Sequence, residues 1–234
     1  MKKIAIIGGG KMGTALAAKL KKEFSIQIVG RDSKMKPCDI VILAIKPQDF
    51  ESLELNLQNE LLISIMAGVN LKKLAEKTCA KKIVRSMPNL PLRVGAGFTG
   101  WISKNVKEKK LVKDIFSMFG EEIELKNEDA INAITALSGS GPAYFFYLCE
   151  LMTEQACHFG FSKKDAEKIA SNTLLGAAEL VRNKTESFAD LRASVSSKKG
   201  TTEAALNYFI RSNFAKLFKD GINRAKARSE KLNK

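Results

Sequence analysis

The sequence predicts an α/β domain with a parallel sheet in its first half and an all-helical domain in its second half. Three observations carry this prediction. Short apolar runs alternate with helical patterns, a glycine-rich turn follows the first apolar run, and no strand pattern follows Asn127. Alternating strands and helices are typical of a parallel sheet covered on both faces. We place a boundary near residue 126, which gives domains of residues 1–126 and 127–234.

Five short apolar runs in the first half predict strands. The third run is apolar almost throughout, as expected for a strand buried on both faces of a sheet. The runs cover residues 3–7, 25–29, 39–44, 61–65 and 82–85. Helical patterns lie between them at residues 11–22, 48–57 and 70–77. Only residues 33–38 separate Asp32 from the third strand. A crossover helix needs about ten residues, so we expect a loop there.

The second half has the pattern of helices throughout. The helical segments cover residues 128–137, 142–159, 163–183, 187–194 and 202–230. A stripe of small and aliphatic side chains that permits close helix contact is formed by Ala170, Leu174, Ala177, Ala178 and Val181. Because several helices are apolar on more than one side, we expect a partner chain to cover them. A monomeric helical bundle is the alternative.

The composition is that of an ordinary globular protein. The chain has 234 residues, 45% hydrophobic and 27% charged, and no apolar run reaches the ~18 residues of a membrane span. The first residues resemble a signal peptide, but glycines and Lys11 interrupt the apolar stretch, so we interpret it as mature sequence of a cytoplasmic protein. Four cysteines without CxxC spacing predict free buried thiols and no metal site.

The chain carries a net charge of +14. Basic proteins often bind nucleic acid, but here the lysines are scattered in pairs and no basic run is interleaved with aromatic residues. We therefore expect neither nucleic acid nor a membrane as a partner, and we interpret the lysines as solvated faces. A positive field also speeds the capture of anionic small molecules, which is a third interpretation.

A glycine-rich turn follows the first predicted strand. Residues 8–13 read GGGKMG, which fits the G-x-G-x-x-G pattern in the required place between a strand and a helix. Gly8 allows the tight turn, Gly10 lets a pyrophosphate approach the backbone, and Gly13 lets the helix pack closely on the strand. The N–H groups of the helix N-terminus and the charge of Lys11 favour phosphate. The turn therefore predicts a dinucleotide site.

The second predicted strand is followed by Arg31 and Asp32. An acidic residue here usually binds the ribose hydroxyls of NAD, whereas an arginine accommodates the 2′-phosphate of NADP. Because Arg31 comes first, with Ser33 and Lys34 behind it, the sequence favours NADP(H) and leaves NAD(H) open.

Three later strand ends carry small and polar residues. Lys46 follows the third strand, residues 64–68 lie at the end of the fourth, and residues 85–91 follow the fifth. Ligands of parallel sheets bind beyond the carboxyl ends of the strands, so we expect these segments to meet in one crevice. Ala67 and Gly68 would let a nicotinamide ring lie close to the backbone.

Two segments of the helical half contain turn residues. Residues 137–142 predict a sharp break between helices, with Pro142 in the first turn of the next helix. Residues 195–202 run into a helix at Gly200, where N–H groups, hydroxyls and two lysines predict either a carboxylate site or a simple capped helix start. The single histidine, His158, lies in an apolar helical context, and we interpret it as a packing residue.

Taken in order, these motifs resemble one enzyme family. The chain reads GGGKMG, AIKPQ, SIMAGV, RSMPNLP, LSGSGPAY and a loop ending in GTT, which is similar to pyrroline-5-carboxylate reductase of proline biosynthesis. The resemblance covers nearly the whole chain, and residues 87–91 and 137–144 are its most specific parts. It implies an N-terminal Rossmann-like α/β domain with a parallel sheet, followed by an all-α dimerisation domain. In that family two subunits interlock, and dimers can assemble into a decamer.

The resemblance also implies an activity, the reduction of the cyclic imine of 1-pyrroline-5-carboxylate to L-proline by hydride transfer from NAD(P)H. The residues that match the pyrophosphate-binding positions of the family are Ile7, Gly8, Gly9, Gly10, Lys11, Met12 and Gly13. The residues at the nicotinamide end are Ala44, Lys46, Pro47 and Ala67. A loop from the partner subunit would hold the substrate carboxylate with Ser197, Gly200, Thr201 and Thr202. Thr202, which would hydrogen-bond the imine nitrogen, and Lys46 are the catalytic candidates.

The chain departs from the family pattern at three places. The family loop commonly reads S-P-G-G, where this chain has Ser197, Lys198, Lys199 and Gly200. A threonine of the family pattern is Leu90 here, and the second helix of the Rossmann fold is missing. Two other functions stand beside this one. They are a β-hydroxyacid-type NADP dehydrogenase that uses Lys198 or Lys199, and a non-catalytic dinucleotide-binding protein.

Overall fold

The computed structural model describes residues 1–31, 33–182 and 185–232. The chain divides into two compact units, of which the first comprises Met1–Pro142 together with the segment from Ile222 onward, and the second comprises Ala143–Gly221. Within the described residues, no helix is long and apolar enough to cross a membrane.

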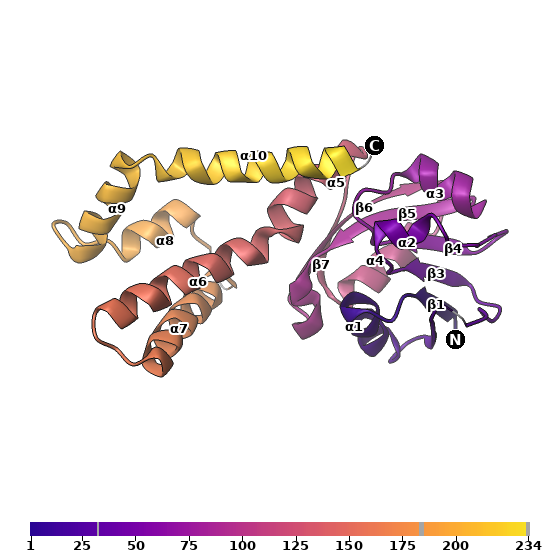
Figure 1. The fold of residues 1–234 in the computed structure, drawn as a ribbon, viewed down its shortest axis with the longest axis horizontal. Helices are drawn as coiled ribbons and strands as arrows, with labels where there is room; N and C mark the ends of the chain where they lie inside the picture. The colour runs from indigo at the N-terminus through magenta and orange to yellow at the C-terminus, as the bar shows by residue number, and fades with distance from the viewer. Residues whose placement is uncertain (32, 183–184, 233–234) are drawn as a thin grey trace. The chain divides into compact units, whose positions relative to one another are not determined.

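The first unit contains a seven-stranded sheet (Figure 1). The strands are β1 (Lys3–Ile7), β2 (Ser25–Val29), β3 (Ile40–Leu43), β4 (Leu61–Ser64), β5 (Lys82–Pro88), β6 (Gly97–Lys104) and β7 (Gly120–Glu124). Their order is β2-β1-β3-β4-β5-β6-β7. The first five strands of that order pair in parallel, β6 runs antiparallel to β5, and β7 is parallel to β6. The five predicted strands and the parallel sheet are confirmed.

Two strands and one helix of this unit were not predicted from sequence. β6 contains two glycines and β7 is mostly acidic, so neither has the apolar run that marks a buried strand. Helix α4 (Lys109–Ser117) lies between them and buries one apolar side at Val112, Ile115 and Phe116. These elements extend the sheet beyond the five strands that the apolar runs indicate.

Two of the three predicted helices of the sheet unit are shorter than predicted, and the third is shifted by one residue. They are α1 (Lys11–Leu20), α2 (Pro47–Phe50) and α3 (Leu71–Thr78). The predicted helix at 48–57 is wrong beyond its first turn, because leucines at 53, 55 and 57 alternate with polar residues, and Leu57 donates its N–H to the carbonyl of Thr78. In the described residues between β2 and β3 there is no helix, so the expected shortened crossover is confirmed.

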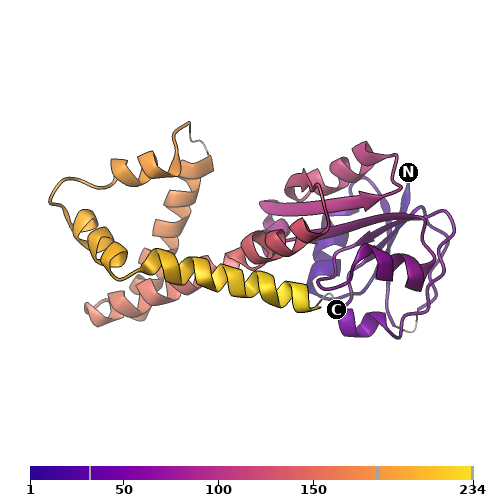
Figure 2. The same ribbon diagram turned by 90° about the horizontal axis from the view of Figure 1, so that it is seen from above.

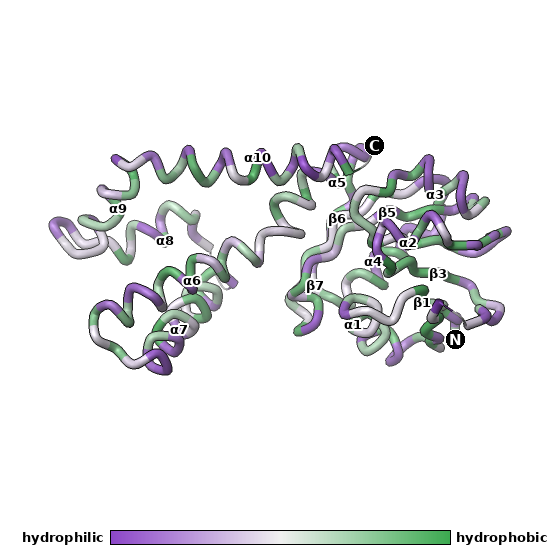
Figure 3. Tube along the Cα trace, in the orientation of Figure 1, coloured by the Kyte–Doolittle hydropathy of each residue, from purple (hydrophilic) through white to green (hydrophobic). Residues whose placement is uncertain are grey.

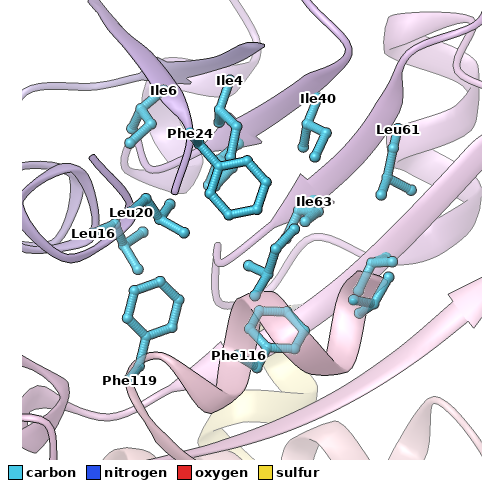
Figure 4. Close-up of a cluster of buried hydrophobic side chains, with 14 of the residues drawn as sticks. Ile4, Ile6, Leu16, Leu20, Phe24, Ile40, Leu61, Ile63, Phe116 and Phe119 are labelled. Atoms are coloured by element: carbon cyan, nitrogen blue, oxygen red, sulfur yellow. The ribbon is translucent and has the colours of Figure 1, made fainter. Parts of the chain in front are cut away.

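Alternating residues of the central strands supply two cores on opposite faces of the sheet. Ile4 and Ile6 belong to a cluster that α1 and α4 cover (Figure 4). Ala5 and Ile7 belong to a second cluster that includes Phe50 of α2. Successive side chains of a strand point to opposite faces, so β1 anchors both layers. The glycine turn that follows β1 is therefore held by a buried strand.

A helical region follows β7. It contains α5 (Asp129–Ile134), a π-helical turn (Thr135–Gly139), α6 (Gly141–His158), α7 (Lys163–Arg182), α8 (Phe188–Ser194), α9 (Thr201–Arg211) and α10 (Phe214–Leu232). The predicted boundary near residue 126 lies where strands give way to helices. The compact units divide later, after Pro142, so the functional division into 1–126 and 127–234 stays a prediction.

Two sequence expectations for the helices are wrong. The single helix predicted at 202–230 is two helices, because Asn213 adopts a left-handed conformation (φ 57°) that ends one helix before the next begins (Figure 2). The sharp break predicted at 137–142 is a π-helical turn, in which Ser140 donates its N–H to the carbonyl of Thr135. Pro142 does lie in the first turn of α6.

The second unit exposes most of its large apolar side chains. Apolar residues recur along α6, α7 and α10 (Figure 3). Among its described residues the buried hydrophobic ones are alanines, namely Ala156, Ala166 and Ala170. Tyr208 is 70% exposed and Leu217 is 68% exposed. Alanines alone bury too little apolar area to stabilise a helical unit, so this surface requires a covering partner.

The last turns of α10 belong to the first unit. Ser229 is buried and donates its hydroxyl to Oδ1 of the buried Asn132 on α5, at 2.8 Å. A side chain on Gly68 would lie 2.7 Å from the carbonyl oxygen of Leu232, and Gly68 has a φ of 73°. Both observations tie the end of α10 to elements that follow β4 and β7. The helical chain therefore returns to the sheet at the loop that follows β4.

Candidate active site

The glycine turn has the close packing that a phosphate-binding turn requires. Gly8 has a φ of 113°, and a Cβ there would lie 2.6 Å from the carbonyl oxygen of Ala44. A Cβ on Gly13 would lie 1.9 Å from the carbonyl oxygen of Gly8. Both positions therefore exclude any side chain. At Gly10, by contrast, a Cβ would meet nothing within 4 Å, so the space in front of the α1 N-terminus is open.

The open space suits a dinucleotide. Gly10 is the capping residue of α1, and it has no side chain that could bind the first N–H groups of the helix. These N–H groups therefore stay available at the opening that the glycines leave. Lys11 is exposed and Met12 is partly buried in the first turn of α1. Free N–H groups at a helix N-terminus favour phosphate. The residues present therefore fit the pyrophosphate of a dinucleotide cofactor.

A cavity of about 660 Å³ adjoins the glycine turn. Ile7, Gly8, Gly9 and Arg31 of the predicted cofactor residues line it. Its other lining residues are Val29, Gly30, Ser33, Lys34, Met35, Ile45, Asp49, Ser52, Leu53, Glu54 and Leu55. The shortened crossover between β2 and β3 supplies part of this wall. The cavity lies beyond the carboxyl ends of β1 and β2, where the adenosine half of a dinucleotide binds in such sheets.

Arg31, at the wall of this cavity, forms an exposed ion pair. One of its terminal guanidinium nitrogens (Nη2) donates to Oδ1 of Asp49 at 3.1 Å, and the Arg31 side chain is 82% exposed. Asp49 lies in α2, directly after the segment that contains Lys46 and Pro47. Asp49 was not singled out from sequence, because a single carboxylate in a short helix carries no motif. Asp32, the predicted alternative to Arg31, lies outside the described residues.

The residues predicted at the nicotinamide end lie at neighbouring strand ends. Ala44 follows β3 and donates its N–H to Ile7, and its carbonyl faces the glycine turn. Lys46 is exposed and caps α2, with Pro47 in the first helical position. Ala67 is partly buried in the loop after β4. β1, β3 and β4 are parallel neighbours, so these residues share one edge of the sheet.

The two most specific motifs of the resemblance meet in the structure. Asn89, directly after β5, donates its side-chain amide to the hydroxyl of Ser138 at 3.1 Å, and its Oδ1 accepts the N–H of Phe98. Below it, the Ser86 hydroxyl donates to the carbonyl of Ser64 at 3.0 Å. The segment at 85–91 therefore links the end of β4 to the π-helical turn. β3, β4 and β5 are parallel neighbours, so their ends share one edge of the sheet, and the expectation that these segments meet in one crevice stays a prediction.

Arg85 has a structural role that sequence reasoning missed. It lies within β5, is 1% exposed, and donates to the Glu128 carboxylate at 2.6 Å. The same oxygen of Glu128 accepts the N–H of Leu71 at the start of α3. Removing one partner of a buried ion pair typically destabilises a protein by about 3–5 kcal/mol. This contact joins β5, α3 and the segment before α5.

The predicted substrate loop lies in the second unit. Gly200 caps α9, which begins at Thr201, and Thr202 is partly buried in its first turn. Gly200 donates its N–H to the carbonyl of Ser197. Lys199 has a φ of 60° and donates its N–H to the Glu203 carboxylate at 2.6 Å. The sequence expectation of a helix that begins at the two threonines is confirmed.

The cysteines and the histidine take no part in these contacts. Cys38 is partly buried, and burial raises the pKa of its thiol. Cys79 and Cys157 are exposed, so the expectation of buried thiols is wrong for them. His158 ends α6 in an exposed position against the ring of Phe159. In the part of the chain that the structure describes, no cluster of His, Cys, Asp or Glu could hold a metal ion.

The fold and the glycine turn with its cavity define a dinucleotide-binding protein that continues into a helical unit. Comparison with known proteins agrees with this class. A family described as pyrroline-5-carboxylate reductase dimerisation matches residues 128–232. A second family, described as NADP oxidoreductase coenzyme F420-dependent, matches residues 17–68.

Relatives of the chain are similar over nearly its whole length. It is 33% identical to pyrroline-5-carboxylate reductase of Pseudomonas aeruginosa, over 94% of this chain and 84% of that protein. It is 31% identical to the enzyme of the same name from Haemophilus influenzae, over 99% and 97%. The solved pyrroline-5-carboxylate reductase from Coxiella burnetii superposes with a TM-score of 0.89 at 31% identity, covering 100% of this chain and 99% of that one. The chain belongs to the pyrroline-5-carboxylate reductase family.

A further solved structure contains a bound cofactor. The pyrroline carboxylate reductase of Plasmodium falciparum, solved with NADP bound, matches with a TM-score of 0.85 at 28% identity, over 100% of this chain and 98% of that chain. Family membership makes this chain an NAD(P)H-dependent oxidoreductase, and the dimerisation match makes it a homo-oligomer.

Proposed function

We propose that this chain reduces the cyclic imine of 1-pyrroline-5-carboxylate to L-proline, the last step of proline biosynthesis. The observation that carries the proposal is the likeness over 94–99% of the chain to reductases of that name. The glycine turn and its open cavity support it, because they fit a dinucleotide. The relatives named above favour neither the β-hydroxyacid dehydrogenase nor the non-catalytic binding protein.

The cofactor is held by residues of the first unit. Gly8, Gly10 and Gly13 keep the turn free of side chains, and the N–H groups at the start of α1 bind the pyrophosphate. The remaining turn residues, Ile7, Gly9, Lys11 and Met12, complete this wall. Arg31 lies in the adenosine cavity, where it pairs with the 2′-phosphate of NADPH. NADP(H) is therefore the preferred cofactor, and NAD(H) is an alternative cofactor that binds at the same site.

The nicotinamide end is bounded by Ala44, Lys46, Pro47 and Ala67. When bound, the cofactor supplies the hydride that reduces the imine carbon. Ala44 and Ala67 keep this region shallow, so that the ring lies near the backbone. Lys46 is exposed at the edge of the sheet and places a positive charge beside the anionic substrate. No strong acid is required, because the imine nitrogen accepts its proton from solution or through a hydroxyl.

The substrate is oriented by the loop that precedes α9. Ser197, Gly200 and Thr201 present a hydroxyl and helix N-terminal N–H groups to the carboxylate. Thr202 donates its hydroxyl to the imine nitrogen and holds the ring for attack on one face. Orientation of this kind supplies most of the acceleration when a cofactor carries the chemistry.

The minimal active assembly is a homodimer in which the partner subunit supplies this loop. The exposed apolar helices of the second unit support this arrangement, and a decamer is a further assembly of such dimers. Neither nucleic acid nor a membrane is a partner in this proposal, and the location is cytoplasmic. Sedimentation at micromolar concentration tests the dimer, because a stable and active monomer would contradict a shared site.

The activity is tested by the steady-state oxidation of NADPH at 340 nm with 1-pyrroline-5-carboxylate. We expect turnover and the formation of proline. β-Hydroxyacids together with NADP⁺ serve as control substrates, because formation of NADPH from these compounds, without turnover of 1-pyrroline-5-carboxylate, would support the dehydrogenase. Binding of NADPH without turnover of either substrate class would support the non-catalytic binding protein.

A further inference from the structure

The adenosine cavity contains carboxylates as well as cations. Arg31 and Lys34 line it together with Asp49 and Glu54. A cavity that only had to bind a 2′-phosphate would gain nothing from carboxylates, because two negative groups repel each other. Of the two carboxylates, Asp49 forms an ion pair with Arg31, and its Oδ1 lies 3.1 Å from the guanidinium.

We propose that Asp49 is a specificity-determining residue that competes with the cofactor's 2′-phosphate for Arg31 and so limits the preference for NADPH over NADH. The inference rests on the proposed function, since it concerns the cofactor of the same site. It adds a residue that neither the glycine turn nor the arginine after β2 would indicate.

The position of Asp49 makes this competition direct. Asp49 is fixed by α2, which begins at Pro47, and its backbone N–H donates to the carbonyl of Lys46. Its carboxylate is 39% exposed, whereas the Arg31 side chain is 82% exposed. The flexible partner is therefore Arg31, and the carboxylate stays in the cavity when the guanidinium turns to a phosphate. The dianionic 2′-phosphate must then draw Arg31 away from Asp49, and it also meets the fixed negative charge of that carboxylate.

NADH does not meet the same obstacle. It has a ribose 2′-hydroxyl in place of the phosphate, and a hydroxyl can donate a hydrogen bond to a carboxylate. Asp49 therefore disfavours one cofactor without disfavouring the other. An exposed ion pair contributes about 0.2–1 kcal/mol, so its release alone changes affinity by about 1.4- to 5-fold. Repulsion of the phosphate acts in the same direction.

The variant Asp49→Asn tests the proposal by direct binding. Dissociation constants for NADP⁺ and NAD⁺ are measured by isothermal titration calorimetry at low and high salt. We expect NADP⁺ to bind about two- to tenfold more tightly at low salt and the gain to shrink at high salt. NAD⁺ binding should stay within about twofold or weaken, because the hydroxyl loses an acceptor with a full charge.

The matched control is Glu51→Gln. Glu51 lies one residue beyond α2 and pairs with Lys73, a hydrogen bond that lowers the pKa of its carboxyl. It does not line the cavity. The control removes the same charge from the same segment, and it should leave the ratio of the two dissociation constants unchanged. In an Arg31→Ala background, the gain from Asp49→Asn should shrink, because no guanidinium is left to release.

Three results would overturn the inference. NADP⁺ binding could stay the same or weaken in Asp49→Asn, which would mean that the carboxylate orients Arg31 for the phosphate. Glu51→Gln could change the ratio of the NADP⁺ and NAD⁺ dissociation constants as much as Asp49→Asn does, which would mean that net charge alone causes the change. The gain could also be identical with and without Arg31. If the unaltered protein binds neither dinucleotide, the proposed function fails instead. Asp49→Ala, with the same readout, serves if the asparagine variant does not fold.

Discussion

Lys198 and Lys199 replace the Pro-Gly pair that is common in the family loop, and the structure shows how to separate their two effects. Lys199 adopts a φ of 60°, a left-handed conformation that costs a non-glycine residue roughly 1–2 kcal/mol. Both side chains are exposed and charged. The double variant Lys198→Ala/Lys199→Gly removes both charges and gives the left-handed position to a residue that adopts it freely.

The expected magnitude follows from these two facts. Each lysine attracts a carboxylate at 4 Å by about 1 kcal/mol in water, so two lysines contribute at most about 2 kcal/mol. That corresponds to about a thirtyfold rise in the substrate Michaelis constant at low salt. At physiological salt the Debye length is about 8 Å, so the rise should fall to a few-fold. Stability should rise by up to about 1.6 kcal/mol, since the relief of strain is only partly offset by the greater freedom of glycine in the unfolded chain.

The assay is the initial rate of NADPH oxidation as a function of 1-pyrroline-5-carboxylate at low and high salt. The turnover number should stay the same, because orientation at the imine does not depend on the lysines. Lys163→Ala/Lys164→Ala, an exposed pair at the start of α7, controls for net charge. A more than about tenfold loss of turnover at both salt concentrations, well beyond screened attraction, would refute the reasoning and place a lysine in the chemistry.

Four further variants test other parts of the site and the fold. Thr202→Ala should lower turnover about five- to hundredfold at every salt concentration, since the imine nitrogen loses its hydrogen-bond donor and is left unsatisfied. Arg31→Ala should raise the Michaelis constant for NADPH about five- to hundredfold, and far more than that for NADH. Gly13→Ala places a methyl group 1.9 Å from a carbonyl oxygen of the glycine turn, so thermal melting should show clear destabilisation and calorimetry no dinucleotide binding. Ser229→Ala breaks a buried hydrogen bond to Asn132, and urea unfolding should show a loss of about 1–3 kcal/mol. Values equal to those of the unaltered protein would contradict each expectation.

The sequence predicts the sheet best where strands are buried on both faces. β1, β3 and β4 are continuous apolar runs, and their boundaries match the predicted ones within a residue or two. β7 is an edge strand of acidic residues, and it is a strand because β6 pairs with it. Pairing with a distant segment leaves no pattern in the local sequence. Hydrophobic periodicity therefore does not predict such strands.

The candidate site divides in the same way. The glycines at 8, 10 and 13 follow a spacing that the backbone itself requires, and so they are predictable. The contact of Asn89 with Ser138 joins residues far apart in sequence, and neither residue type indicates the other. Asp49 and Glu128 are similar cases, since each pairs with an arginine that is distant in sequence, Arg31 after β2 and Arg85 in β5. Sequence motifs predict local geometry, whereas ion pairs and hydrogen bonds between distant segments can be identified only once the fold is known.

The substrate loop and the apolar helices belong to the same compact unit, which has a consequence for activity. This unit buries alanines but no large side chain among its described residues, so its packing depends on a second copy of the chain. The loop before α9 is anchored by short-range contacts, such as Lys199 to Glu203 and Gly200 to Ser197. Those contacts shape the loop, but they cannot position it against a cofactor bound at the sheet. In the proposed dimer, association therefore supplies both the missing core of the helical unit and the placement of Thr202, so that folding and catalysis would depend on the same interface.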